Sequence, residues 1–163
     1  MQVERNSVWQ VTGIDGIKDD TYRVLEHDAS NDLLILFRLH DGNGLEKPVS
    51  VEFSIFLESA KCGNSKTSSY SIPFYQLISE EEISPAHRDK RNKRFELIQD
   101  LISNPNFLHD VVLNQRSKIV ASHAKERGVY VQKIYRSLNQ YWRYGQEINA
   151  LLPAYKHCGG SGK

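Results

Sequence analysis

The chain has 163 residues, of which 39% are hydrophobic and 25% charged. This is enough apolar sequence for one ordinary domain or two small ones, and it excludes wholesale disorder. There is no apolar run of the roughly 20 residues that a membrane helix needs, and residues 1–10 lack the basic and then apolar layout of a signal peptide. We therefore expect a cytoplasmic protein without a membrane partner. Cys62 and Cys158 lie far apart in the sequence and outside any Cys/His grid, so we expect free thiols and no metal site.

The net charge of +1 conceals two halves of opposite sign. Up to Pro85 the chain holds 7 Lys and Arg against 14 Asp and Glu, a net charge of −7. The remainder holds 14 against 6, a net charge of +8. This asymmetry is expected if a basic unit that binds a polyanion is joined to an acidic unit with a different function. Two solvated surfaces of unequal charge give it as well, so charge alone does not decide between these interpretations.

The first half predicts a small β meander. β-branched, aromatic and other apolar residues gather in short runs, and these predict strands at 8–11, 21–25, 33–39 and 49–53. The sequence Asp-Gly-Asn-Gly at 41–44 predicts a turn. The spacing of apolar residues from Phe53 to Ala60 predicts a short helix that ends at Gly63, and a returning strand is expected at 66–74. The aromatic residues expected in the core are Trp9, Tyr22, Phe37, Phe53 and Phe56.

The second half predicts three helices, because apolar residues recur there every three or four positions. The first begins at Ser84-Pro85, a typical cap and first-turn pair, and ends at Asn104-Pro105-Asn106. A second is expected from about 110–114 to 127, and a third from 131 to 142. The polar side of the first helix is strongly basic, which is typical either of a solvated face or of a face that follows a phosphate backbone.

Gly128 joins the second and third helices in the manner of a helix-turn-helix. Ala124, four positions earlier, is small enough to let the helices cross closely, and Gly128 supplies a turn conformation that costs other residues more. The expected core of the motif is Ala124, Gly128, Ile134, Leu138 and Trp142. We predict an α+β chain in three parts: an acidic β-rich domain, a meander or barrel, at 1–78; a three-helix helix-turn-helix domain at 79–148; and a linker at 149–163.

A helix-turn-helix places its last helix in the major groove of DNA, where outward side chains reach base edges. Glutamine bonds adenine there, and lysine or arginine bonds guanine or phosphate. The base-reading candidates are Tyr130, Gln132, Lys133, Arg136, Ser137 and Gln140. The candidates for contact with the phosphate backbone are Arg88, Lys90, Arg91, Lys93, Arg94, Arg116, Lys118, Lys125, Arg127 and Arg143. An ordinary exposed helix face is the alternative interpretation.

Two segments resemble a known family. One is Tyr135-Arg-Ser-Leu138 followed by Tyr141-Trp142-Arg-Tyr-Gly145-Gln-Glu-Ile-Asn149-Ala-Leu-Leu-Pro153-Ala-Tyr155, and the other combines residues 8–11 with 20–25. Both are similar to TnsB, the end-binding transposase subunit of heteromeric cut-and-paste and CRISPR-associated transposons. The likeness is weakest from about 42 to 82. It implies a parent protein that binds repeats in both transposon ends, pairs them, and cuts and joins the 3′ strands with a Mg²⁺-dependent, RNase-H-like DDE core.

The resemblance also sets expectations for this chain. We expect the catalytic core to be absent and the chain to be an N-terminal, DNA-binding and non-enzymatic fragment that needs no cofactor or metal. Its expected partners are double-stranded DNA at transposon ends, other transposition proteins and further copies of itself, in the nucleoid of a prokaryote. Family members often carry Thr or Ser where this chain has Tyr130. That difference leaves open which of Val131, Gln132 and Lys133 faces the bases.

Other functions fit the sequence less well. The main alternative is a transcriptional regulator with an acidic sensor domain and a helix-turn-helix reader, and a protein-interaction domain comes third. A phosphate loop at 159–163 would need glycine at position 157, which is histidine. We expect the carboxylates at 80–82 to be solvated and His123 to be packed or on the surface, without a catalytic role. We also expect that the acidic half does not lie flat on DNA, because phosphates repel it; it contacts another protein or inserts a local loop.

Overall fold

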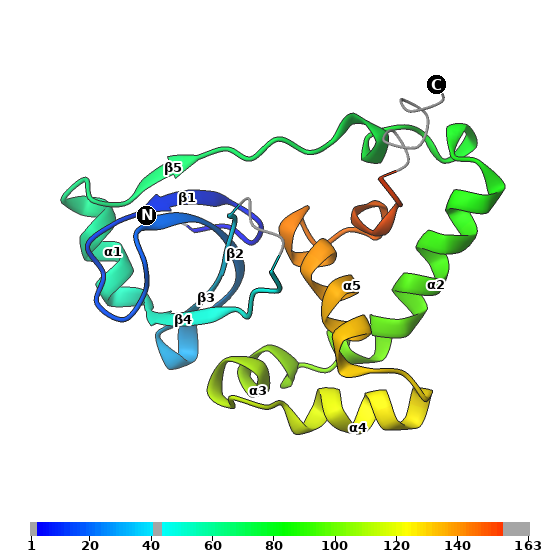
Figure 1. Ribbon diagram of the computed structural model, residues 1–163. Coiled ribbons are helices and arrows are strands. Elements are labelled where there is room, and N and C mark those ends of the chain that lie inside the picture. The colour runs from blue at the N-terminus through cyan, green and yellow to red at the C-terminus, as the bar shows by residue number, and fades with distance from the viewer. Residues whose placement is uncertain (1–2, 41–43, 155–163) are drawn as a thin grey trace.

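The computed structural model describes residues 3–40 and 44–154. It is an α+β fold in which a curved antiparallel sheet lies between one helix and a group of four others (Figure 1). The turn expected at 41–44 lies outside the described residues except for Gly44, and so do Cys158 and the linker beyond Ala154. None of the described helices is long and apolar enough to cross a membrane.

The sheet has five strands in the order β4-β3-β2-β1-β5, and neighbouring strands are antiparallel. Consecutive strands pair from β1 to β4, which is the predicted meander, and β5 returns to pair with β1. The returning strand is shorter than the predicted 66–74, and Pro73, which has no N–H to donate, lies in the segment that follows it. The strands are β1 (Val8–Val11), β2 (Asp20–Asp28), β3 (Leu33–Arg38), β4 (Val49–Glu52) and β5 (Lys66–Ser68).

Both faces of the sheet are buried. Successive side chains of a strand point to opposite faces, so Leu34 and Leu36 of β3 pack on the side of helix α1 (Phe53–Lys61), while Ile35 and Phe37 pack toward the helices of the second half. This explains why 33–37 is an unbroken apolar run rather than an alternating one.

The other helices are α2 (Pro85–Ile102), α3 (Phe107–Leu113), α4 (Lys118–Arg127) and α5 (Val131–Arg143). The start of α2 is as predicted, since the Ser84 hydroxyl accepts a hydrogen bond from the N–H of His87 at 3.2 Å. The prediction of one helix from about 110–114 to 127 is wrong. Ser117 caps a new helix there by accepting a hydrogen bond from the N–H of Val120 at 3.1 Å, so α3 and α4 are separate.

A single apolar core joins the sheet to these helices. Trp142 of α5 is 1% exposed, and its ring lies 5.6 Å from that of Phe37 on β3 and 6.4 Å from that of Phe107 on α3. The same cluster includes Leu25 from β2 and Ile98 from α2. The core therefore runs across the predicted boundary between residues 78 and 79.

Polar bonds fix the C-terminal end of α5 to the sheet. Arg23 of β2 is buried, and its guanidinium donates to the carbonyl of Arg143 at 3.1 Å and to that of Asn6 at 2.7 Å. Burial lowers the pKa of Arg23 from its ordinary value. The Gln146 amide donates to the side chain of Asn6 and to the carbonyl of Leu25. These contacts set the position of α5 relative to β2.

Candidate nucleic-acid interface

The turn between α4 and α5 depends on Gly128. Its φ of 65° and ψ of 35° lie in the left-handed region, and its N–H and that of Val129 bond to the carbonyls of Lys125 and Ala124 at the end of α4. Nothing lies within 4 Å of where a Cβ would stand, so a larger residue is opposed here by backbone strain alone. The predicted need for glycine at this position is met by the geometry.

The residues that the sequence grouped around this turn lie together in the structure. Ile134 and Leu138 are 0% exposed, Trp142 1% and Ala124 4%, and all four belong to the same apolar cluster. α4 and α5 therefore pack through these residues, which form the buried side of α5.

α5 presents a polar face to solvent. Gln132, Lys133 and Arg136 are exposed and Gln140 is half-buried. Within residues 3–40 and 44–154, no hydrogen bond or ion pair engages the side chains of these four residues. Their donors and charges are thus available to a bound molecule.

Two other base-reading candidates have different surroundings. Tyr130 is 84% exposed and occupies the N-cap position before Val131, the first residue of α5. Its side chain makes no capping bond. Ser137 is only 4% exposed, because it lies on the flank of α5 that turns toward α2. The prediction that Ser137 reads bases is therefore corrected, because its side chain is buried beside a groove between α2 and α5.

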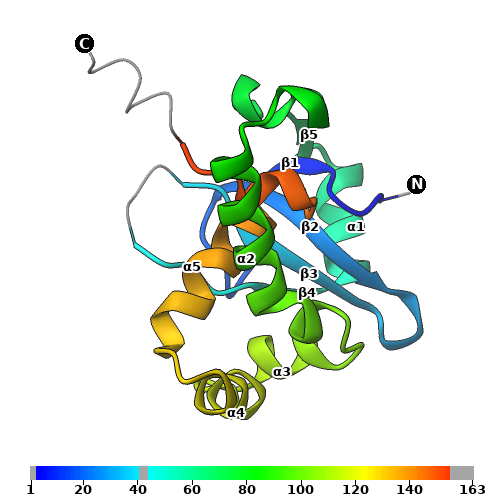
Figure 2. The same ribbon diagram turned by 90° about the vertical axis from the view of Figure 1, so that its right-hand side faces the viewer.

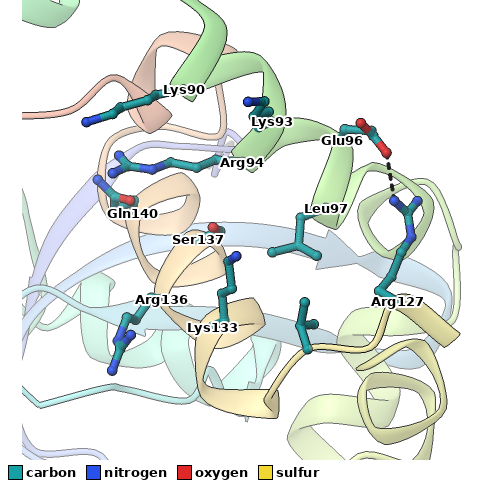
Figure 3. Close-up of a pocket in the computed structure, with 11 residues that line it drawn as sticks. Lys90, Lys93, Arg94, Glu96, Leu97, Arg127, Lys133, Arg136, Ser137 and Gln140 are labelled. Atoms are coloured by element: carbon teal, nitrogen blue, oxygen red, sulfur yellow. Dashed lines mark hydrogen bonds and ion pairs between the residues drawn. The ribbon is translucent and has the colours of Figure 1, made fainter. Parts of the chain in front are cut away.

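This groove of about 520 Å³ runs between α2 and α5 (Figure 3). Among its described lining residues Glu96 is the only acid, and the Arg127 guanidinium donates to it at 2.7 Å. Figure 3 shows Lys90 and Arg94 of α2 near Gln140 of α5. The groove therefore attracts anions along one side of α5. Its six cationic residues are Lys90, Lys93, Arg94, Arg127, Lys133 and Arg136.

The remaining backbone candidates differ in how far the fold already engages them. Lys93 pairs with Asp89 at 3.0 Å on an exposed surface. Others donate to main-chain carbonyls: Arg94 to Leu151 at 3.0 Å, Arg88 to Glu80 and Ile83 at 2.9 and 3.2 Å, and Arg143 to His40 at 2.7 Å. Four of the predicted phosphate contacts are exposed and form no ion pair or side-chain hydrogen bond within the described residues: Lys90, Arg116, Lys118 and Lys125.

Arg91 is not accessible to DNA, which corrects its prediction as a phosphate contact. It is 5% exposed, and its guanidinium donates to both carboxylate oxygens of Glu80, at 2.8 and 2.9 Å, and to the side chain of Asn149 at 2.9 Å. The bond from Arg91 holds the pKa of Glu80 below its usual value. Glu80 is thus paired rather than simply solvated. The burial of Arg91 could have been predicted from the sequence. Arg91 lies seven residues before Ile98, which is buried, and residues at this spacing share one side of a helix.

No group of three or more His, Cys, Asp or Glu side chains is placed to hold a metal ion among the described residues. His123 is 7% exposed and its Nε2 bonds to the carbonyl of Leu97 at 2.6 Å, so it is packed, as predicted. What the surface offers is a row of donors and positive charges.

Residues 91–155 match the family model of the TnsB second domain. Over these residues the chain resembles TnsB. Over 92 residues it is also 29% identical to the Transposon Tn7 transposition protein TnsB of Escherichia coli, an alignment that covers 56% of this chain and 13% of that relative. The TnsB second-domain match begins within α2 and includes α3, α4 and α5. The TnsB-like segment thus holds the Gly128 turn and all six base-reading candidates.

Proposed function

We propose that this TnsB-like chain binds the repeats of transposon-end DNA in a sequence-specific manner and so positions the parent transposase for cleavage and joining of the 3′ strands. α4 and α5 act as a helix-turn-helix, with α5 in the major groove. The observation that carries the proposal is the polar face of α5 beside a groove lined by six cations. The exposed side chains of that face form no hydrogen bond or ion pair within the described residues.

The side chains on α5 divide into readers and anchors. Gln132, near the start of the helix where contact with bases is deepest, can bond adenine through its amide. Arg136, one turn further, matches guanine with two parallel donors, and Lys133 donates to guanine or phosphate. Gln140 and the exposed Tyr130 extend the same face at its two ends.

The α2–α5 groove supplies affinity rather than sequence preference. Lys90 and Lys93 of α2 and Arg127 at the end of α4 line it beside Lys133. Phosphate oxygens along one DNA strand match such a row, and each contact releases counterions, so binding weakens steeply with salt. Of the outlying candidates, Arg116, Lys118 and Lys125 keep this role because they are exposed.

Binding of this kind needs no metal or cofactor in the chain. The alignment spans 13% of the curated relative, so the cutting and joining steps and the other transposition proteins are proposed for the parent protein alone. The nucleoid is the location that this function requires. Neither comparison favours the transcriptional regulator.

Selection of bound sites from a pool of random DNA duplexes tests the proposal. We expect one recovered motif, and we expect it to recur as repeats near the ends of the element that encodes the chain. Arg136→Ala should weaken binding to that motif by about 1–3 kcal/mol and relax the preference at one base position. Recovery of no motif, or equal binding by Arg136→Ala and the wild type, would overturn the assignment of α5.

A further inference from the structure

The connection between β3 and β4 is fixed directly to α5. Asn139 of α5 is 6% exposed; its amide oxygen accepts the N–H of Glu46 at 2.8 Å, and its amide nitrogen donates to the carbonyl of Glu46 at 3.1 Å and to that of Tyr135 at 2.9 Å. The Asn139 amide thus holds both main-chain polar groups of Glu46. Figure 2 shows the cyan segment around residues 44–48 on the same side of the molecule as α5.

The one carboxylate of the segment 44–48 is neutralised inside the protein. Glu46 lies 2.6 Å from the Arg38 guanidinium and 2.8 Å from the His40 ring. The next residue, Lys47, extends the other way, and its ammonium donates to the carbonyls of Asn114 and Gln115 just before α4. The acidic half of the chain thus presents a cation at its contact with the helices.

A second hollow of about 590 Å³ lies between this connection, the start of α4 and α5. Lys47, Arg116 and Gln132 line it, and so does the exposed Leu45. Neighbouring residues on a helix point about 100° apart. Gln132 lines this hollow while Lys133 lines the α2–α5 groove, so the two depressions flank opposite sides of the exposed face of α5.

Duplex DNA has a matching layout. The major groove is about 12 Å wide and bounded by a phosphate backbone on each side, so a helix inside it has phosphates on both flanks. We infer that the β3–β4 connection supplies one of these two contacts: Lys47, together with Arg116, binds the phosphate backbone of duplex DNA on the flank of α5 that faces away from α2. This inference rests on the proposed placement of α5 in the major groove. It brings the acidic half to the DNA through one local segment while the sheet stays clear of the phosphates.

Charge reversal at Lys47 tests the inference against a matched control. The probe is a fluorescently labelled duplex that carries the motif recovered by selection, titrated at salt concentrations from about 50 to 200 mM. We expect Lys47→Glu to weaken binding by about tenfold or more and to reduce the slope of log Kd against log salt by about 1. Lys66→Glu changes the same charge on exposed β5 at the edge of the sheet and should stay within about twofold of the wild type.

A second variant separates charge from structure, because Lys47 also bonds the loop before α4. Lys47→Gln keeps a donor for the carbonyls of Asn114 and Gln115 but removes the charge, so it should lower the salt slope by about 1 as well, with an unchanged melting temperature. Crosslinking gives an independent readout. In a background with Cys62 and Cys158 replaced by serine, Leu45→Cys should crosslink to a duplex with thiol-tethered phosphates, and Ile55→Cys on α1 should not.

Two results overturn the inference while leaving the proposed function intact. One is equal binding by Lys47→Glu and Lys66→Glu when Arg136→Ala still loses the site. The other is absence of the Leu45→Cys crosslink under the same condition. If Arg136→Ala also binds like the wild type, the placement of α5 in the major groove is wrong, and the inference about Lys47 is then wrong as well.

Discussion

Two arginines that look alike in the sequence should behave in opposite ways when each is replaced by alanine. Arg91 is buried and bonded to Glu80 and Asn149, whereas Arg136 is exposed and bonded to nothing within the described residues. A hydrogen bond to a charged group contributes about 1.5–3 kcal/mol. In Arg91→Ala, water replaces part of this stabilisation, because the Glu80 carboxylate is half exposed and is hydrated once Arg91 is removed. We therefore expect Arg91→Ala to lower the free energy of unfolding by about 2–3 kcal/mol.

For a chain of this size such a loss lowers Tm by roughly 5–10 °C. Arg136→Ala removes an exposed side chain and should change stability by no more than about 0.5 kcal/mol, while its specific binding falls about 5- to 150-fold. Thermal unfolding and fluorescence anisotropy on both variants, with binding measured well below Tm, provide the test. If Arg91→Ala melted like the wild type and lost affinity for DNA, our account of the buried guanidinium would be refuted.

Three further outcomes follow from local geometry. Gly128→Ala forces a side chain into the left-handed region and should lower the free energy of unfolding in urea by about 1–2 kcal/mol. Gly44→Ala changes a glycine outside that region and should cost less, so an equal loss in the two variants would contradict backbone strain as the cause. Ser117→Ala removes the cap of α4 and should cost about 1 kcal/mol, visible as faster amide exchange in the first turn. The pKa of Asp28 is lowered to about 2, first by its bond from the Asn31 side chain. Because this folded pKa is depressed, the carboxylate stabilises the fold above an unfolded pKa of about 3.9, and that contribution disappears as pH falls toward 2. Asp28→Asn should abolish this part of the acid sensitivity in unfolding curves, and an unaltered pH profile would exclude it.

The sequence predicted the elements whose signal is local. The apolar run at 33–39 and the repeat of three and four positions in α5 each fix a strand or helix by themselves. The break between α3 and α4 was missed, because apolar residues continue at helical spacing across Ser117 and only its capping bond marks the new start. The same limit applied to Arg91, which charge counting grouped with its exposed neighbours although its position on α2 is buried.

Long-range contacts of the candidate site lay beyond any local pattern. Asn139 and Glu46 are 93 positions apart, and nothing in the residues around either one indicates their bond. Arg23 and Arg143 are 120 positions apart and meet only because β2 and α5 share one core. The sequence therefore identified which side of α5 is polar but did not indicate what holds that helix in place.

These contacts give the acidic half a defined part in the proposed function. Asn139 ties the middle of α5 to the β3–β4 connection, and Arg23 and Gln146 tie its C-terminal end to β2 and the segment before β1. A reading helix discriminates bases only if its side chains reach fixed positions, because a base contact is lost over a displacement of about one hydrogen-bond length. In the proposed complex, the sheet supplies that rigidity from the side of α5 that faces away from DNA. The opposite charges of the two halves are then compatible with one DNA interface. In this arrangement the acidic half holds α5 in place, and the basic half carries the side chains that bind DNA.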